Sequence, residues 1–233
     1  MINNCLNCDD ELVEMMTWRG LFYREPQFLC YACDKQLVKI DGKRCLGCSR
    51  SLDDLAPQLI KGDGCLDCHR WEVDPRWKGI LHQNFSMYFY NDFLKEYLAK
   101  YKYRGDYVLA KAFSHTIKSY LAKVDYDFII PIPLSEERLY ERGFNQSTAL
   151  LEEAEVRPSN ILARSHSEKQ SKKTRKERLS QEQVFQLVES DLNGKSVLLF
   201  DDIYTTGTTL RQAARLLKEA GAEEVSSLTL ARG

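Results

Sequence analysis

The stretch VLLFDDIYTTGTTLRQAARLL (Val197–Leu217) joins an apolar run, two acids, a threonine-rich turn and an amphipathic helix. Because Asp201 and Asp202 follow the apolar run, we expect them at the carboxyl edge of a sheet, where α/β proteins bind ligands. Gly207 allows a tight curve there, and the amides that open the helix point toward an anion. Four hydroxyls add donors, those of Thr205, Thr206, Thr208 and Thr209. The stretch therefore predicts a loop for a sugar phosphate, with acids for ribose hydroxyls and amides for the 5-phosphate.

Two other kinds of local structure have sequences similar to this stretch. A plain strand–turn–helix with a threonine N-cap needs one threonine, whereas this turn has four together with a glycine and two acids. A Walker B strand also ends in acids, but it accompanies G-x-x-x-x-G-K-[ST], which this sequence lacks. The phosphate loop is the interpretation that uses all of these residues.

The sequence on either side of this stretch alternates between patterns typical of strands and of helices. Strands are expected over 86–90, 128–133, 161–164, 196–200 and 224–231. Helices are expected over 91–103, 108–122, 144–155 and 208–221, and a polar loop from Pro133 to Gly143. The alternation predicts an α/β fold with a doubly wound, mainly parallel sheet.

All eight cysteines precede this region, and they form four C-x-x-C pairs: Cys5/Cys8, Cys30/Cys33, Cys45/Cys48 and Cys65/Cys68. Each pair places two thiolates on one metal ion from a single turn, so two pairs complete a tetrahedral Cys₄ site. The sequence predicts two structural zinc ions, most simply one for the first two pairs and one for the last two. Interleaved and nested pairings stay open. A short segment with few large aliphatic residues also needs metal binding to fold.

The composition shift after the last cysteine predicts three parts. We expect a double zinc-ribbon module over 1–70, a linker over 71–79 and the α/β domain over 80–233. The sequence begins without the charged and apolar regions of a signal peptide, and its apolar runs are too short for a bilayer. A cytoplasmic protein is expected, where thiols stay reduced and bind metal rather than form disulfides.

The net charge of −1 excludes a uniformly basic nucleic-acid coat but not a local basic patch. Arg164–Arg178 is such a patch, because seven basic and two acidic residues leave an excess of five positive charges. A solvated loop and a nucleic-acid contact are both open interpretations. The residues expected to contact phosphates are Lys169, Lys172, Lys173, Arg175, Lys176 and Arg178.

The phosphate-loop stretch resembles the motif of type I phosphoribosyltransferases that binds phosphoribosyl pyrophosphate (PRPP). That resemblance implies ribose contacts for Asp201 and Asp202, a 5-phosphate site at Thr205–Thr209, and Mg²⁺ bound with PRPP. In these enzymes the loop after the first core strand contacts pyrophosphate, so Arg138 and Arg142 are the expected contacts here. The region of these enzymes that corresponds to the basic segment is a flap over the active site.

Further motifs resemble the ComF family across nearly the whole chain. They are the zinc module, KYRGD (Lys102–Asp106), PIPLS (Pro131–Ser135), RGFNQ (Arg142–Gln146) and DDIYTTGTTL. The eight cysteines resemble its ComFC branch, whose members serve the uptake of transforming DNA. The resemblance implies single-stranded DNA binding beside a ComFA-type translocase ATPase, with recruitment to the membrane through that DNA-uptake partner. The alternative is a phosphoribosyltransferase that transfers ribose 5-phosphate from PRPP to an acceptor that no residue identifies.

Overall fold

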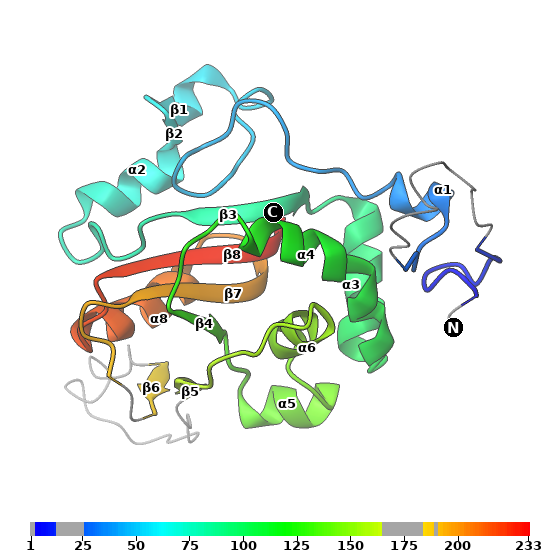
Figure 1. The fold of residues 1–233 in the computed structure, drawn as a ribbon. Helices are drawn as coiled ribbons and strands as arrows, with labels where there is room; N and C mark the ends of the chain where they lie inside the picture. Colours follow the sequence, from blue (N-terminus) through cyan, green and yellow to red (C-terminus); the bar gives the residue numbers. More distant parts are fainter. Residues whose placement is uncertain (1–2, 13–25, 165–183, 189–190) are drawn as a thin grey trace, which may run out of the picture.

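The computed structural model describes residues 3–12, 26–164, 184–188 and 191–233. Its centre is a sheet of four parallel strands in the order β3-β8-β7-β4. The strands are β3 (Asn84–Phe89), β8 (Glu224–Arg232), β7 (Ser196–Tyr204) and β4 (Phe128–Pro131). Figure 1 shows β8 and β7 in the middle of this sheet. The predicted α/β fold with its parallel sheet is confirmed.

Side chains of β7 alternate between two cores, as expected for a strand buried on both sides. Leu198 and Phe200 belong to the core with the helical layer, and Val197 and Leu199 to the core with α8. The helical layer contains α3 (Asp92–Tyr103), η2 (Tyr107–Phe113), α4 (Ser114–Leu121) and α6 (Gln146–Glu153). Helix α8 (Thr208–Glu219) covers the other face. The sheet is therefore doubly wound.

Local sequence signals explain where α3 begins and how it packs. The Asn91 side chain caps the helix by accepting a hydrogen bond of 2.9 Å from the amide of Leu94. Every third or fourth residue then points into the core: Leu94, Tyr97, Leu98 and Tyr101 are buried. This periodic burial brings the C-terminal end of α3, with Lys102, to the edge of the sheet that carries Asp202.

Two expected elements differ in the structure. The segment expected as a polar loop contains the helix α5 (Glu136–Arg142), because Ser135 caps it and left-handed Gly143 ends it. The helix expected over 108–122 is divided into η2 and α4. The strand expected over 161–164 is β5 (Leu162–Arg164), which pairs with β6 (Phe185–Leu187) in a separate antiparallel hairpin.

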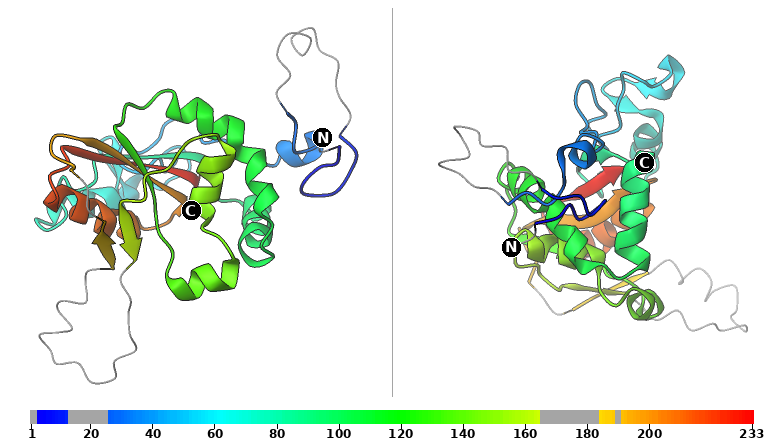
Figure 2. Two further views of the ribbon diagram at one scale, coloured as in Figure 1. Left: turned by 60° about the horizontal axis from the view of Figure 1, so that its bottom comes forward. Right: turned by 90° about the vertical axis from the view of Figure 1, so that its right-hand side faces the viewer.

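The cysteine-rich part forms two small units. The first contains α1 (Tyr31–Asp34), and the second contains η1 (Pro57–Leu59), β1 (Ile60–Lys61), β2 (Gly64–Cys65) and α2 (Leu66–Val73). Figures 1 and 2 show the first unit at the opposite end of the molecule from the β5–β6 hairpin. Buried residues of the first unit join the core of the helical layer, and those of the second join the core of α8.

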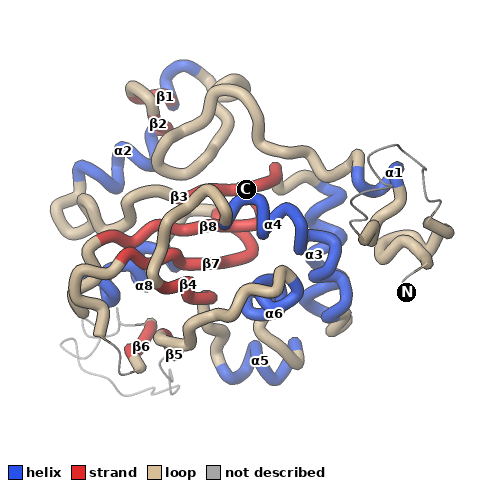
Figure 3. The backbone as a smooth tube through the Cα atoms, viewed as in Figure 1, coloured by secondary structure: helices blue, strands red, loops and turns tan. Residues whose placement is uncertain are grey.

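The segment between the two units runs along the sheet, as the tan tube in Figure 3 shows. The Ile40 amide donates to the Met87 carbonyl at 3.0 Å, and the Phe89 amide donates to the Val38 carbonyl at 2.9 Å. The segment thus covers the edge of β3.

The division of the chain at residues 70 and 80 stays a prediction, and α2 crosses the first boundary. No helix in the described ranges is long and apolar enough to cross a bilayer.

Candidate functional site

The two acids and the threonine-rich turn lie where parallel strand β7 ends. Asp201 is paired in register with Thr229 of β8, and the strand continues through Asp202 to Tyr204 before the chain turns. Left-handed Gly207 then leads directly into α8. The structure thus joins Asp201, Asp202 and the Thr205–Thr209 loop at one edge of the sheet, as the sequence predicts.

Asp201 is partly buried, and the pKa of its carboxyl group is raised to about 7, first by loss of solvent and then by the neighbouring charge of Asp202. Its Oδ1 atom accepts hydrogen bonds from the Ser147 hydroxyl at 3.1 Å and from the Asp202 amide at 2.9 Å. These bonds fix the side chain but oppose the pKa shift only partly. Near neutral pH the group exchanges a proton, so a cation or a hydroxyl donor at this place favours its charged form.

Asp202 forms an ion pair with Lys102, and both side chains are largely buried, at 13% and 15% exposure. The lysine is the first residue of the KYRGD motif and comes from the end of α3, far from Asp202 in the sequence. Its charge compensates one of two adjacent carboxylates. Lys102 is therefore a site residue that the motif contains but to which sequence analysis gives no role.

Gly207 is required for both its backbone angle and its lack of a side chain. Its φ is +80°, and a Cβ atom there would overlap the Tyr204 hydroxyl and the Arg211 guanidinium. The Arg211 Nη1 atom donates to the Tyr204 hydroxyl at 2.6 Å, and Arg211 is only 2% exposed. A positive charge is thus buried directly beneath the loop.

The four threonines of the loop are exposed, and their hydroxyls are available to a ligand. The hydroxyls of Thr206 and Thr208 lie 2.9 Å apart. The Thr206 carbonyl accepts a hydrogen bond of 3.2 Å from the Trp71 indole of α2. The loop is therefore open toward solvent and supported from behind.

Of the two arginines expected to contact pyrophosphate, Arg138 is exposed on α5 and lies near Arg164 of β5. Burial lowers the pKa of Arg164, and repulsion from Arg138 adds to the effect, while the Asp201 charge opposes it. Arg142 points elsewhere: it donates to Gln146 Oε1 at 2.8 Å and lies over the Tyr103 ring. Arg164 thus lies within electrostatic reach of both Arg138 and Asp201. The sequence predicts Arg164 only as the first residue of the basic segment Arg164–Arg178.

The basic residues from Lys169 to Arg178 lie outside the described residues, and their predicted contacts stay predictions.

The cysteines form two groups in chain order: Cys5, Cys8, Cys30 and Cys33, then Cys45, Cys48, Cys65 and Cys68. In each group all four sulfur atoms lie within 4.8 Å of one another. The Sγ–Sγ distance is 3.7 Å for Cys8–Cys30 and for Cys48–Cys65. A tetrahedral zinc site with Zn–S bonds of about 2.3 Å needs sulfur atoms about 3.8 Å apart, so the donors fit this metal. Of the open pairings, the sequential one is confirmed.

The local backbone is also that of a metal-binding turn. Asp9 and Ser49, which follow the second cysteine of the first pair in each group, take left-handed φ angles of 65° and 59°. Both groups are therefore compatible with structural zinc.

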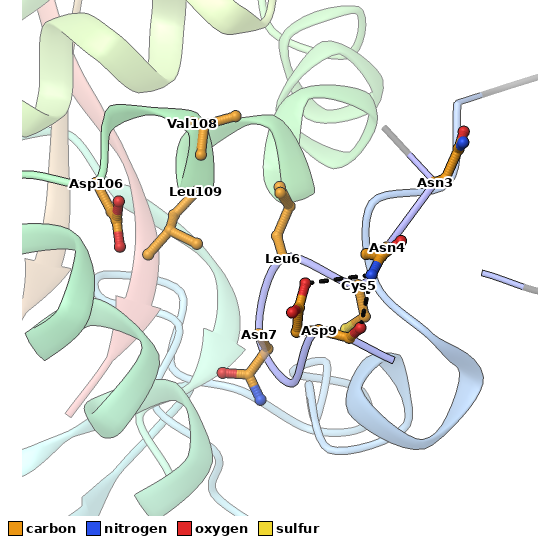
Figure 4. Close-up of a pocket in the computed structure, with 9 residues that line it drawn as sticks. All are labelled: Asn3, Asn4, Cys5, Leu6, Asn7, Asp9, Asp106, Val108 and Leu109. Atoms are coloured by element: carbon orange, nitrogen blue, oxygen red, sulfur yellow. Dashed lines mark hydrogen bonds between the residues drawn. The ribbon is translucent and has the colours of Figure 1, made fainter. Parts of the chain in front are cut away.

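A separate pocket lies between the first cysteine turn and the start of η2 (Figure 4). Asn4, Asn7 and Asp9 line one side, and Asp106 and Leu109 line the other. None of the residues of the phosphate loop takes part.

Comparisons with known proteins agree with this arrangement. The family model "Phosphoribosyl transferase domain" matches residues 141–233, which contain β7, the phosphate loop and β8. Competence protein ComFC of Bacillus subtilis is 44% identical over 234 residues, covering 98% of this chain and 94% of that protein. Competence protein ComFC of Streptococcus pneumoniae is 32% identical over 231 residues, covering 98% and 99%. Competence protein F of Haemophilus influenzae is 26% identical over 232 residues, covering 92% and 94%.

Two of these relatives match over nearly their whole length, and the matched region contains both Cys₄ groups and the loop at the end of β7. The chain therefore belongs to the ComF family of competence proteins, in its ComFC branch.

Proposed function

We propose that this chain binds the ribose and 5-phosphate of PRPP at the loop Asp201–Thr209. The observation that carries this proposal is Arg211, a guanidinium that is 2% exposed directly beneath Gly207. Among the described residues no carboxylate forms an ion pair with it; its partners are the Tyr204 hydroxyl and the Trp71 ring. A buried charge needs a counter-charge, and a phosphate in the loop would supply it.

The two acids complete the ligand chemistry. Asp201 and Asp202 would accept hydrogen bonds from the ribose hydroxyls, and carboxylate oxygens are ligands that Mg²⁺ prefers when it accompanies phosphates. Lys102 supports this role because it compensates Asp202 and so reduces repulsion of an anionic ligand. Binding that draws on a charged Asp201 should strengthen as pH rises toward 7.

Calorimetric titration with magnesium-PRPP and with ribose 5-phosphate tests this site. Asp202→Ala and Thr206→Val should each weaken binding by about 1–3 kcal/mol, since each removes a polar partner of the ligand. Ser119→Ala, on the exposed side of α4, is the control and should bind like the unchanged chain. Folded unchanged chain that takes up neither ligand at millimolar concentration would refute the proposal.

We further propose that the chain binds single-stranded DNA beside this site. Strand binding without sequence preference needs a positive track and aromatic faces for stacking. Helices α3 and α5 contact each other and present two exposed rings, Tyr103 at 75% exposure and Tyr140 at 92%. The exposed side chains of Arg104 and Arg138 lie close to these tyrosines in the sequence. Arg142 lies 5.8 Å from the Tyr103 ring centroid. The basic residues Lys169–Arg178 would supply further contacts to the DNA phosphates.

The family supplies the setting for DNA binding. Its relatives are named competence proteins, which supports a role in natural transformation. In this role the chain would act in the cytoplasm and aid DNA uptake with a ComFA-type ATPase, which would bring it to the membrane.

Salt dependence of binding to a labelled single strand tests the DNA contact. If about four phosphates are neutralised, log affinity should fall against log salt with a slope near −3. Changing Lys172, Lys173, Arg175 and Lys176 together to Ala should reduce both affinity and slope. A control that removes the same charge from the cysteine units and the turn after α2 changes Lys35, Lys43, Lys61 and Lys78 to Ala. If only the control loses affinity, the contact lies on the cysteine units and the basic segment is a lid.

A second candidate function is phosphoribosyl transfer, favoured by Arg164, which interacts electrostatically with both Arg138 and Asp201. Two guanidiniums that repel each other are suited to a pyrophosphate between them. Release of pyrophosphate from magnesium-PRPP in the presence of candidate acceptors, lost in Arg164→Ala, would establish the activity. If the chain binds PRPP but releases no pyrophosphate from it with any acceptor, the site serves binding alone.

A further inference from the structure

The second Cys₄ group has a buried arginine beside it. The Arg232 Nη2 atom lies 3.6 Å from Cys48 Sγ, and the residue is 5% exposed. Its Nη1 atom also donates to the Gly233 oxygen. Within the described ranges no acidic side chain forms an ion pair with Arg232, so among side chains the sulfur atoms are the charge that it contacts. Four thiolates around a divalent ion carry a net charge of about −2, which a buried guanidinium compensates.

The same guanidinium fixes the start of the phosphate loop. Its Nη1 atom donates to the Tyr204 carbonyl at 3.2 Å, and its Cζ atom lies 4.8 Å from the Tyr204 ring centroid. The Gly233 amide donates to the same carbonyl at 2.9 Å. Tyr204 is the last residue of β7, and its hydroxyl accepts from Arg211 beneath the loop. Arg232 thus joins the metal-binding group to the residue from which the loop begins.

A second connection runs through α2, the helix that contains Cys68. Trp71, one turn further along, donates from its indole to the Thr206 carbonyl at 3.2 Å. The Arg211 Cζ atom lies 4.7 Å from the Trp71 ring centroid. The second Cys₄ group therefore reaches both ends of the turn that contains Thr205 and Thr206.

The first Cys₄ group has different neighbours. Asn7 donates to Cys33 Sγ at 3.3 Å, and its own side-chain oxygen accepts from Lys100 of α3 at 3.0 Å. Its buried cysteines belong to the core on the other face of the sheet. This group links toward Asp202 along α3, where Lys102 follows Lys100 by two residues. Among the contacts of the described residues, none joins it to the turn Tyr204–Thr209, so it is an internal control for that turn.

We propose that the second Cys₄ group positions the phosphate loop, with Arg232 as the positioning residue. Metal bound by Cys45, Cys48, Cys65 and Cys68 and a phosphorylated ribose in the loop would then stabilise each other, whereas metal in the first group would not. This inference rests on the proposed binding of a ribose phosphate. Coupling between two sites is reciprocal, so each ligand must raise the affinity for the other by the same factor.

The unchanged chain provides the first test. Its two zinc ions are removed by an increasing concentration of chelator at equilibrium, with and without saturating ribose 5-phosphate. We expect the sugar phosphate to raise the affinity for one zinc ion about tenfold and to leave the other unchanged. Cys8→Ser, which lacks a ligand of the first group, should keep the zinc ion that responds. Equal release of both ions with and without the sugar phosphate would overturn the coupling.

The second test compares two residues whose side chains contact a cysteine sulfur atom, Arg232 at the second group and Asn7 at the first. Arg232→Met should weaken ribose 5-phosphate about tenfold (about 1.4 kcal/mol), while Asn7→Ala should bind like the unchanged chain. Arg232→Lys keeps the charge but lacks the second donor arm, and we expect an intermediate loss. An equal loss in Asn7→Ala and Arg232→Met would overturn a specific role for the second group. Unchanged chain that binds no ribose 5-phosphate would instead refute the proposed function, together with the coupling that rests on it.

Discussion

Replacing Asp201 with asparagine should make the protein more stable at alkaline pH than at acidic pH, relative to the unchanged chain. The pKa of this carboxyl group is raised from 3.8 to about 7. When the pKa of a carboxyl group is higher in the folded state than in the unfolded state, the folded protein is most stable at pH values below the unfolded pKa. This stability is lost as the pH rises through the folded pKa. At about 1.36 kcal/mol per pKa unit, the charged form costs about 4 kcal/mol above pH 7 and about 2 kcal/mol at pH 5.

The substituted asparagine side chain would avoid this cost and keep the local bonds. Both hydrogen bonds of the carboxyl group, from Ser147 and from the Asp202 amide, end on Oδ1, which an asparagine retains. Urea unfolding at pH 5 and pH 8 should therefore show a stabilising effect of Asp201→Asn that is about 2–3 kcal/mol larger at pH 8. Asp202→Asn is the control and should destabilise at both pH values, because it leaves Lys102 without its carboxylate. A stabilisation by Asp201→Asn that is equal at both pH values would contradict the burial argument.

Two further predictions concern the loop and the metal. Gly207→Ala should lower the free energy of unfolding by about 2–5 kcal/mol, because the left-handed angle costs about 1–2 and overlap with Tyr204 and Arg211 the rest. Gly62 is also left-handed, but a Cβ atom there would have no neighbour within 4 Å, so Gly62→Ala should lose only the about 1–2 kcal/mol of the backbone angle. An equal loss of unfolding free energy in the two variants would contradict the overlap at Gly207. Elemental analysis should find two zinc ions per chain and one after Cys30→Ser, with the circular dichroism of the sheet retained. Only one zinc ion in the unchanged chain would rule out two closed sites.

The geometry of the loop Asp201–Thr209 could be predicted because all of its parts are consecutive in the sequence. A strand, two acids and Gly207 define its geometry within a few residues, and the structure places them together. The partners of these residues come from distant segments. Lys102 reaches Asp202 from α3, and Ser147 reaches Asp201 from α6. Such contacts depend on how helices pack, which no local pattern specifies.

The cysteines show the same limit. Spacing within each pair predicts a metal-binding turn, but which turns share an ion depends on the fold between them. Helix α5 was predictable in principle, since Ser135, the acids Glu136 and Glu137, and Gly143 are ordinary start and stop signals. Its short length and polar composition favour the loop interpretation, which is wrong for Glu136–Arg142.

The segment at Val38 and Ile40 has a consequence for shortened forms of the chain. In the whole protein it satisfies backbone groups of β3 through hydrogen bonds with Met87 and Phe89. A chain beginning at residue 80 would lose this cover and present β3 as a free, apolar strand edge. Such edges pair with one another between molecules, so the isolated sheet domain should aggregate. The segment between the cysteine units would thus also protect the solubility of the sheet, a role that requires neither a nucleotide nor DNA.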